Sequence, residues 1–330
     1  MALGVAAEGA LEQALARLGA ALGLGPEQRL TLTAGGTAAN ALAIACAVGA
    51  RPGRHLIAQP TEHPSVLRPL RALEEAGYEL TWLGVDPDGR VDPEELAAAL
   101  RPDTALCSLM AANHETGALQ PLAAVAARCR AAGVLLHSDA VQALGRLPLA
   151  ALPADLLTFS AHKLGGPRGL GGLISGPLAP ACTGHGPGAR RVAALAAALE
   201  AGLPDPEQVR ASRDALEAEL LARVAGARRN GPPVARLPGH LSLSFPGVSG
   251  EALALELDLA GIAASSGAAC ASGEARPSHV LVAMGRSARE ASESLRLSLG
   301  RPLDAAERAR VVASVERAVA RLRGLAGAGS

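Results

Sequence analysis

The amino-acid sequence predicts an α/β fold, in which helices flank a mostly parallel sheet, followed by a smaller α+β domain. In the first half, short β-rich runs alternate with helical patterns of about ten residues or more, which is typical of parallel sheets. Several of these runs end on a polar or charged residue. After Ile174 the chain becomes irregular and rich in small residues, and then continues as separate helices and strands.

The expected strands of the first domain are short and mostly apolar. They cover residues 29–33, 55–60, 78–85, 105–112, 133–140, 155–163 and 170–175. Proline and capping residues mark the helices between them: Pro64 suits a first helical residue, Asp92 with Pro93 forms a strong helix start, and Pro121 opens another helix. A glycine turn at 35–36 leads from the first strand into a helix.

The second domain is expected to begin where the alternation stops. We predict a large domain over residues 1–203 and a small domain over residues 204–330. Asp205 caps a long helix in the small domain. Its further elements are strands over residues 240–245 and 294–300, and helices over residues 249–259, after Pro277 and over residues 303–325.

Composition excludes several classes of partner. Apolar residues make up 49% of the chain, but aromatic residues only 1%, so the sequence lacks the rings on which single-stranded nucleic acids stack. Lys plus Arg and Asp plus Glu both number 31, which leaves no net charge to attract phosphate backbones or anionic membranes. No run of about 18 uncharged apolar residues predicts a membrane helix. We expect neither nucleic acid nor membrane as a partner.

The cysteines favour a cytoplasmic location. Five are present, an odd number, and they are widely spaced without a CxxC pair. This pattern argues against a disulfide framework and against a zinc site, so no metal is expected. The apolar start of the chain lacks a basic leader and carries Glu8, Glu12 and Arg17 at spacings that suit an amphipathic helix.

Polar residues gather at predicted strand ends, where sheets of this kind bind ligands. His63, His114, Asp139 and Lys163 all lie at or just past such ends. Each could be an ordinary loop residue, and most lysines are surface charges, but four together favour a site. The glycine turn before Thr37 leaves free N–H groups at a helix start that could hold a phosphate, although such turns are common in α/β proteins.

The order of these elements resembles the fold-type I pyridoxal-phosphate (PLP) enzymes, specifically the cysteine desulfurases of the NifS/IscS group. The resemblance covers nearly the whole chain. The matching strings are TAGGTAANALAI, TEHPSVL, ANHETGALQP, HSDAVQALGRLPL, SAHKLGGPRGLGGL, the stretch from LSLSFPGVSG to EARPSHVL, and SLRLSLGR. It implies a PLP cofactor and the PLP-transferase fold, with its smaller C-terminal domain.

The resemblance also implies roles for the residues at these positions. Lys163 would hold PLP covalently and shuttle protons, and Asp139 would pair with the pyridine nitrogen and keep the ring an electron sink. His63 would stack on the ring and exchange protons with the substrate. The remaining implied contacts are Gly36, Thr37, Ser160 and His162 to the phosphate, Gln142 and His114 to the phenolic oxygen, and Arg296 to the substrate carboxylate.

Cys270 is the candidate nucleophile. A cysteine is often only a small hydrophobic residue, but the surrounding SSGAACASGEARPSHVL is poor core material. In the family the equivalent thiolate takes sulfur from L-cysteine, which leaves L-alanine and a persulfide that passes to an acceptor protein, such as an iron–sulfur scaffold or a carrier. A homodimer is also implied. Selenocysteine lysis, another lyase or aminotransferase reaction, and a partner-dependent subunit of a sulfur-transfer assembly are the alternatives.

The sequence departs from the family pattern at several points. Family members usually begin with a further segment near the active site, so the chain is expected to be shortened at its N-terminus. An R-x-G-T segment is also missing, since no threonine follows Thr183. His114 stands where asparagine is common, and Ala38 where glutamate is common. Histidine can still donate a hydrogen bond at that position.

Overall fold

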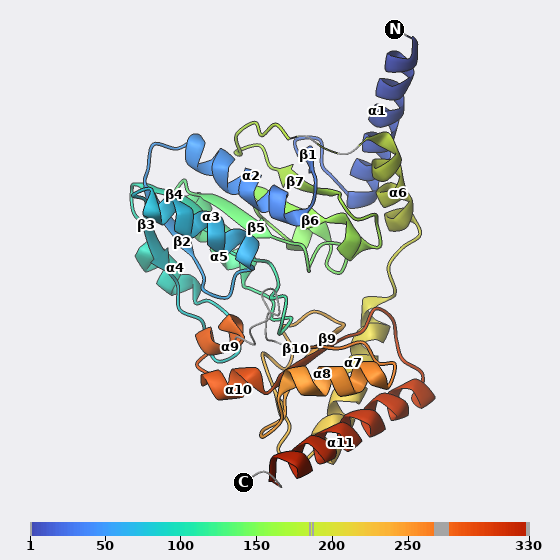
Figure 1. The fold of residues 1–330 in the computed structure, drawn as a ribbon. Helices are drawn as coiled ribbons and strands as arrows, with labels where there is room; N and C mark the ends of the chain where they lie inside the picture. Colours follow the sequence, from blue (N-terminus) through green and yellow to red (C-terminus); the bar gives the residue numbers. More distant parts are fainter. Residues whose placement is uncertain (1, 185, 187, 267–276, 328–330) are drawn as a thin grey trace. The chain divides into compact units, whose positions relative to one another are not determined.

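A computed structural model describes residues 2–184, 186, 188–266 and 277–327 of the chain (Figure 1). The fold divides into two compact units. The first consists of Met1–Gly84, Val91–Ala112 and Gln120–Leu203, and the second of Val85–Arg90, Asn113–Leu119 and Pro204–Ser330. Among the helices of the described residues, none is both long enough and apolar enough to cross a membrane.

The first unit is built on a seven-stranded sheet in the order β1-β7-β6-β5-β4-β2-β3. Its strands are β1 Arg29–Thr33, β2 His55–Ala58, β3 Glu79–Trp82, β4 Thr104–Ser108, β5 Leu135–Asp139, β6 Leu156–Ser160 and β7 Gly171–Ser175. Neighbours from β3 to β6 are parallel, which confirms the predicted mostly parallel sheet. Strand β7 runs antiparallel to both β1 and β6, because the short connection from β6 leaves no room for a crossover helix.

The helices of the first unit are α1 Ala2–Leu22, α2 Gly36–Gly49, α3 Pro64–Glu75, α4 Pro93–Ala99, α5 Leu122–Ala131 and α6 Ala189–Glu200, with 3-10 turns η1 Leu149–Ala151 and η2 Ala161–Leu164. Helices α3 and α4 begin at the predicted residues Pro64 and Pro93, and α5 begins one residue after Pro121. The Asp92 side chain caps α4 by accepting a hydrogen bond from the Glu94 N–H. Helices α1 and α6 lie side by side (Figure 1) and are joined by the Arg17–Glu200 ion pair.

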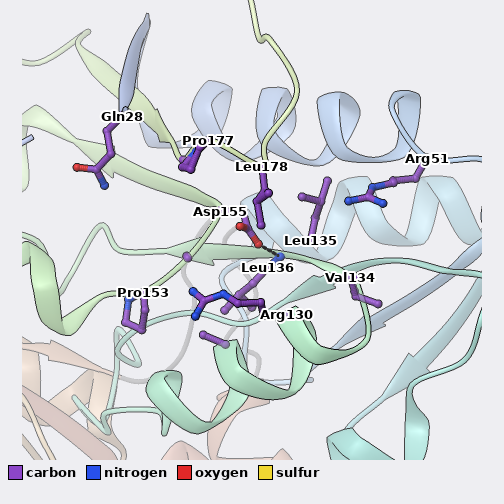
Figure 2. Close-up of a pocket in the computed structure, with 14 residues that line it drawn as sticks. Gln28, Arg51, Arg130, Val134, Leu135, Leu136, Pro153, Asp155, Pro177 and Leu178 are labelled. Atoms are coloured by element: carbon purple, nitrogen blue, oxygen red, sulfur yellow. Dashed lines mark hydrogen bonds between the residues drawn. The ribbon is translucent and has the colours of Figure 1, made fainter. Parts of the chain in front are cut away.

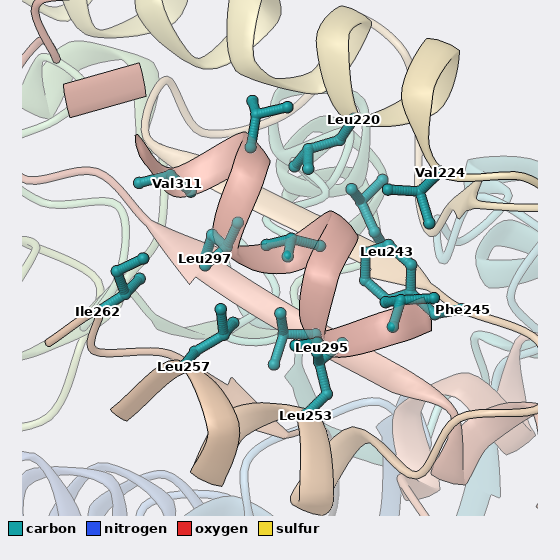
Figure 3. Close-up of a cluster of buried hydrophobic side chains, with 14 of the residues drawn as sticks. Leu220, Val224, Leu243, Phe245, Leu253, Leu257, Ile262, Leu295, Leu297 and Val311 are labelled. Carbon is teal, nitrogen blue, oxygen red and sulfur yellow. The ribbon is translucent and has the colours of Figure 1, made fainter. Parts of the chain in front are cut away.

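The second unit has a four-stranded antiparallel sheet in the order β10-β11-β9-β8. Its strands are β8 Arg228–Arg229, β9 His240–Ser244, β10 Ser265–Ser266 and β11 Ser294–Ser298, and its helices are α7 Pro206–Arg223, α8 Gly250–Leu259, α9 His279–Ala283, α10 Ala288–Ser292 and α11 Ala305–Gly327. Figure 3 shows the buried cluster of this unit, in which Leu243 and Leu295 from the sheet meet Leu253 and Leu257 from α8. Aliphatic side chains dominate the cluster, as the low aromatic content predicts.

Two short segments belong to the second unit, although the predicted boundary places them in the first domain. Residues 85–90 and 113–119 precede residue 203, yet they belong to the second unit. The backbone explains why: the Leu119 N–H donates to the Ala235 carbonyl (2.8 Å) and the Leu237 N–H donates to the Gly117 carbonyl (2.9 Å). Gly117 has φ of 76°, and a Cβ there would lie 2.5 Å from His240 Cβ, so this close approach requires glycine. His114 is therefore part of the second unit.

Two leucines of α8, one buried and one exposed, allow a test of how this helix packs in the second unit. Leu253 is 0% exposed and Leu255 is 62% exposed. We expect Leu253→Ala to lower the free energy of unfolding by about 2–5 kcal/mol, because a cavity replaces packed atoms. Leu255→Ala should change it by less than about 0.5 kcal/mol. Urea unfolding followed by circular dichroism measures both, and equal losses would contradict the described orientation of α8.

Candidate functional site

Asp139 is a buried carboxylate at the carboxyl end of β5. One oxygen accepts a hydrogen bond from the Val141 N–H (2.9 Å), and the other accepts one from Asn40 Nδ2 (2.7 Å). Burial raises the pKa of Asp139, while these hydrogen bonds and the charge of His63 oppose the rise. A cationic ring nitrogen placed against this carboxylate would offset the cost of its burial.

Asn40 connects Asp139 to its surroundings, and it is not among the site residues predicted from the sequence. It lies on α2 with 0% exposure. Its Nδ2 also donates to Ser65 Oγ (2.8 Å), and its Oδ1 accepts a hydrogen bond from the Thr158 hydroxyl. The available signal was one polar residue within the otherwise apolar run AANALAIACAV, three residues beyond Thr37. Asn40 thus ties helix α2 to strands β5 and β6.

His63 caps helix α3 and is exposed. Its Nδ1 accepts the Ser65 N–H (3.1 Å) and lies 2.7 Å from Ser65 Oγ. Because Nδ1 accepts a backbone hydrogen bond, the neutral ring carries its proton on Nε2. Through Ser65 and Asn40, a continuous line of hydrogen bonds runs from His63 to Asp139.

Lys163 lies at the same edge of the sheet as Asp139. Strands β5 and β6 are parallel with Asp139 opposite Thr158, and Lys163 follows directly after the end of β6, in η2. Gly165 closes this turn with φ of 78°, a conformation that favours glycine. The Lys163 carbonyl accepts a hydrogen bond from Arg146 (3.4 Å), and burial lowers the pKa of Arg146. The structure therefore brings together the lysine and the aspartate that the sequence singled out.

The start of α2 and the end of β6 form a cradle suited to a phosphate. A Cβ on Gly36 would lie 3.0 Å from Val141 Cγ2 and 3.3 Å from Ser160 Cβ, so glycine permits this approach. Among the described residues, no side chain caps α2. Ser160 Oγ lies 2.9 Å from His162 Nδ1, and Thr37 is exposed in the first turn of α2. Helix N–H groups together with hydroxyl and imidazole groups are a common set of phosphate ligands.

Glu62 is a second buried acid near this edge, and its role was not predicted. It is 0% exposed and accepts hydrogen bonds from Gln59 Nε2 (2.9 Å) and the Met110 N–H. Burial, together with the charge of Asp139, raises the pKa of Glu62 to about 8, although both hydrogen bonds oppose the shift. Glu62 therefore keeps its proton at neutral pH. Gln142, three residues after Asp139 in the chain, is also buried, and its carbonyl accepts a hydrogen bond from Arg146 (3.1 Å).

Arg296 and His114 lie together in the second unit. Arg296 Nη1 donates to the His114 carbonyl (2.8 Å), and Nη2 donates to Ser265 Oγ (3.1 Å). Arg296 Nε is buried and has no hydrogen-bond partner among the described residues. Burial lowers the pKa of Arg296, and the charge of Glu115 opposes this. A part-buried guanidinium with an unsatisfied N–H is suited to an anionic ligand.

Cys270 falls outside the described residues. Of the other four cysteines, Cys107 and Cys129 are buried, and Cys46 and Cys182 are partly buried. A hydrogen bond with Cys129 and burial raise the pKa of Cys107, and burial raises the pKa of Cys182 to about 12. Both thiols stay protonated and are poor nucleophiles.

A separate cavity of about 410 Å³ opens at the amino ends of β5 and β6 (Figure 2). Its wall includes Leu135, Leu136 and Leu178, with Arg51 and Asp155 among them. The Asp155 carboxylate accepts the Leu136 N–H (2.9 Å). Asp139 lies at the other end of β5, so none of the predicted site residues lines this cavity.

Comparisons with known proteins agree with the resemblance seen in the motifs. The model of the class-V aminotransferase family matches residues 1–180 and 183–309. Cysteine desulfurase 2 of Trichormus variabilis is 38% identical over 334 residues, which is 96% of this chain and 84% of the relative. Cysteine desulfurase IscS of Anaeromyxobacter sp. is 39% identical over 350 residues, covering 98% and 84%.

Solved structures give the same assignment. A NifS-like protein matches with a TM-score of 0.81 and 27% identity over 98% of this chain and 88% of its own. DndA from Streptomyces lividans matches with a TM-score of 0.74 and 33% identity, covering 90% and 89%. The chain therefore belongs to the class-V aminotransferase family, in its NifS/IscS-like group of cysteine desulfurases.

Proposed function

We propose that this protein is a PLP-dependent cysteine desulfurase, which converts L-cysteine to L-alanine and carries the sulfur as a persulfide on Cys270. The observation that carries the proposal is the gathering of Lys163, Asp139 and the α2 cradle at one edge of the sheet. Relatives 38–40% identical to this chain are named cysteine desulfurases, which supports the reaction assigned.

The residues of the first unit fit PLP by charge and by shape. The N–H groups of α2 at Gly36 and Thr37, with Ser160 and His162, would hold its phosphate. The Lys163 amine would hold its aldehyde carbon covalently. Asp139 would face its ring nitrogen, and Gln142 would contact its phenolic oxygen. When bound, PLP supplies an electron-withdrawing ring that eases bond breaking at the α-carbon and β-carbon of an amino acid.

Proton handling falls to His63 and Lys163. The hydrogen bond to His63 Nδ1 fixes the ring, and its Nε2 is the position that would give or take a proton. The Lys163 amine would move the proton at the α-carbon of the substrate. Burial raises the pKa of Glu62 to about 8, so Glu62 keeps its proton near pH 7 and adds no negative charge to that of Asp139.

Arg296 would bind the α-carboxylate of L-cysteine, and Cys270 would receive its sulfur. The Cys270 thiolate attacks the substrate sulfur, so an S–S bond forms as the Cβ–S bond breaks. The electron pair of that bond stays with the substrate carbon, which then takes a proton to give L-alanine. The persulfide would pass to a sulfur-acceptor protein, for example in iron–sulfur cluster assembly, and we propose that the enzyme is a homodimer.

Cys270→Ala tests the function. We expect wild-type protein with PLP to show the absorbance of lysine-bound cofactor and to form alanine from cysteine. The variant should keep the absorbance, because Lys163 is intact, and lose more than about 99% of alanine formation, because a nucleophile essential to the reaction is gone. Cys182→Ala is the matched control and should keep both. Wild-type protein that binds PLP but forms no alanine would contradict the proposal.

Arg296→Lys tests the carboxylate contact. Lysine keeps the charge but loses the planar donor pair, so KM for L-cysteine should rise about 10- to 100-fold. The kcat should change much less, because the contact is made in both the bound substrate and the transition state. Steady-state alanine formation measures both constants. An unchanged KM would remove Arg296 from the substrate site.

A further inference from the structure

The turn at residues 113–116 is hydrogen-bonded to two other elements of the second unit, strand β11 and the start of helix α9. Asn113 Oδ1 accepts the N–H groups of Glu115 and Thr116, both at 2.9 Å, so the side chain fixes the turn locally. The His114 carbonyl accepts from Arg296 of β11 (2.8 Å). The Glu115 carboxyl accepts from the hydroxyl of Ser278 (2.5 Å).

The contact between Glu115 and Ser278 is buried. Glu115 is 9% exposed and Ser278 is 2% exposed. Ser278 is also the N-cap of α9, since its Oγ accepts the Leu281 N–H (3.1 Å). The serine hydroxyl therefore has one donor and one acceptor role, both of them used. The distance to Glu115 is typical of a hydroxyl donating to a charged carboxylate.

The groups that face Glu115 favour opposite charge states. Burial raises the pKa of Glu115 to about 7, whereas the Ser278 hydrogen bond and the charge of Arg296 oppose the shift. His114 Nε2 lies 3.7 Å from Glu115 Oε1, and the rings of His114 and His279 are 6.1 Å apart. Glu115 thus changes charge near neutral pH, and it is next in the chain to His114, whose carbonyl holds the arginine proposed for substrate binding.

We propose that Glu115 is a positioning residue that sets, by losing or gaining its proton, how strongly Arg296 binds the substrate carboxylate. The inference rests on the proposed function, because that function assigns Arg296 to the carboxylate of the substrate. Ionised Glu115 offsets part of the positive charge of Arg296 and so weakens carboxylate binding. Protonated Glu115 leaves that charge uncompensated, and its carbonyl oxygen can still accept from Ser278, so the start of α9 is retained.

Glu115→Gln tests the inference, because glutamine can accept from Ser278 but cannot ionise. We expect the affinity of the wild-type holoenzyme for L-alanine, and 1/KM for L-cysteine, to fall between pH 6 and pH 8 relative to the variant. The ratio between the two proteins should change by roughly 3- to 30-fold, as for nearby part-buried charges. Substrate groups titrate equally with both proteins and cancel in the ratio. The kcat ratio should stay near one.

Glu293→Gln is the matched control, because Glu293 is a similarly buried glutamate of the same unit that accepts hydrogen bonds from Gly247 and Arg289. Its ratio to wild type should not change with pH. A constant ratio for Glu115→Gln across this range would overturn the proposal. A merely structural role would lower affinity or stability at every pH alike.

A second arm needs no turnover. The folded-state pKa of Glu115 lies above its ordinary value of 4.5, so its proton stabilises the fold. This stability is complete below about pH 4.5 and is lost as pH rises through about 7. The urea midpoint of the wild type should therefore fall as pH rises from about 4.5 to 7. We expect the midpoint of Glu115→Gln to fall less over this range, because glutamine cannot ionise. If the wild type forms no alanine, the proposed function fails. If the urea midpoint of Glu115→Gln depends on pH as that of the wild type does, the role assigned to Glu115 is overturned, whatever the activity.

Discussion

The Asn40–Asp139 hydrogen bond is the contact on which the first unit's candidate site depends. Asp139 is a buried carboxylate, and burial makes its charge costly unless hydrogen-bond donors surround it. Asn40 provides one of these donors from α2, while its own amide oxygen accepts from Thr158 of β6. One side chain therefore fixes the charged group, the helix whose N-terminus forms the cradle, and the strand that leads to Lys163.

Asp139, Glu62 and Glu115 are buried acids whose surroundings favour different protonation states. Asp139 has donors and a nearby imidazole that favour its charge. Glu62 is raised to a pKa of about 8 and stays protonated, so two negative charges do not meet in the first unit. Burial raises the pKa of Glu115, in the second unit, to about 7, while the Ser278 hydrogen bond and the charge of Arg296 oppose the rise. The number and kind of neighbours, rather than residue type, decide each protonation state.

Much of the fold could be predicted from local physical signals. Proline and aspartate at 92–93 and 205–206 start helices α4 and α7 because their geometry suits a first turn. Apolar runs predicted the strands because the five inner strands, β2 and β4 to β7, are buried along their whole length. The placement of Lys163 and Asp139 at one edge also followed from sequence, since Asp139 ends one strand and Lys163 lies just past the end of its parallel neighbour.

The sequence by itself determined which segments form strands and helices and which charged residues end at the ligand-binding edge, because those properties depend on neighbours along the chain. Only the tertiary structure decided that residues 113–119 join the second unit, since their hydrogen bonds reach Ala235 and Leu237. It also revealed Asn40, whose partners lie 25 to 118 residues away. Burial of Glu62 and Glu115 was likewise invisible in sequence, because the exposure of an acid depends on segments that meet only in the folded chain.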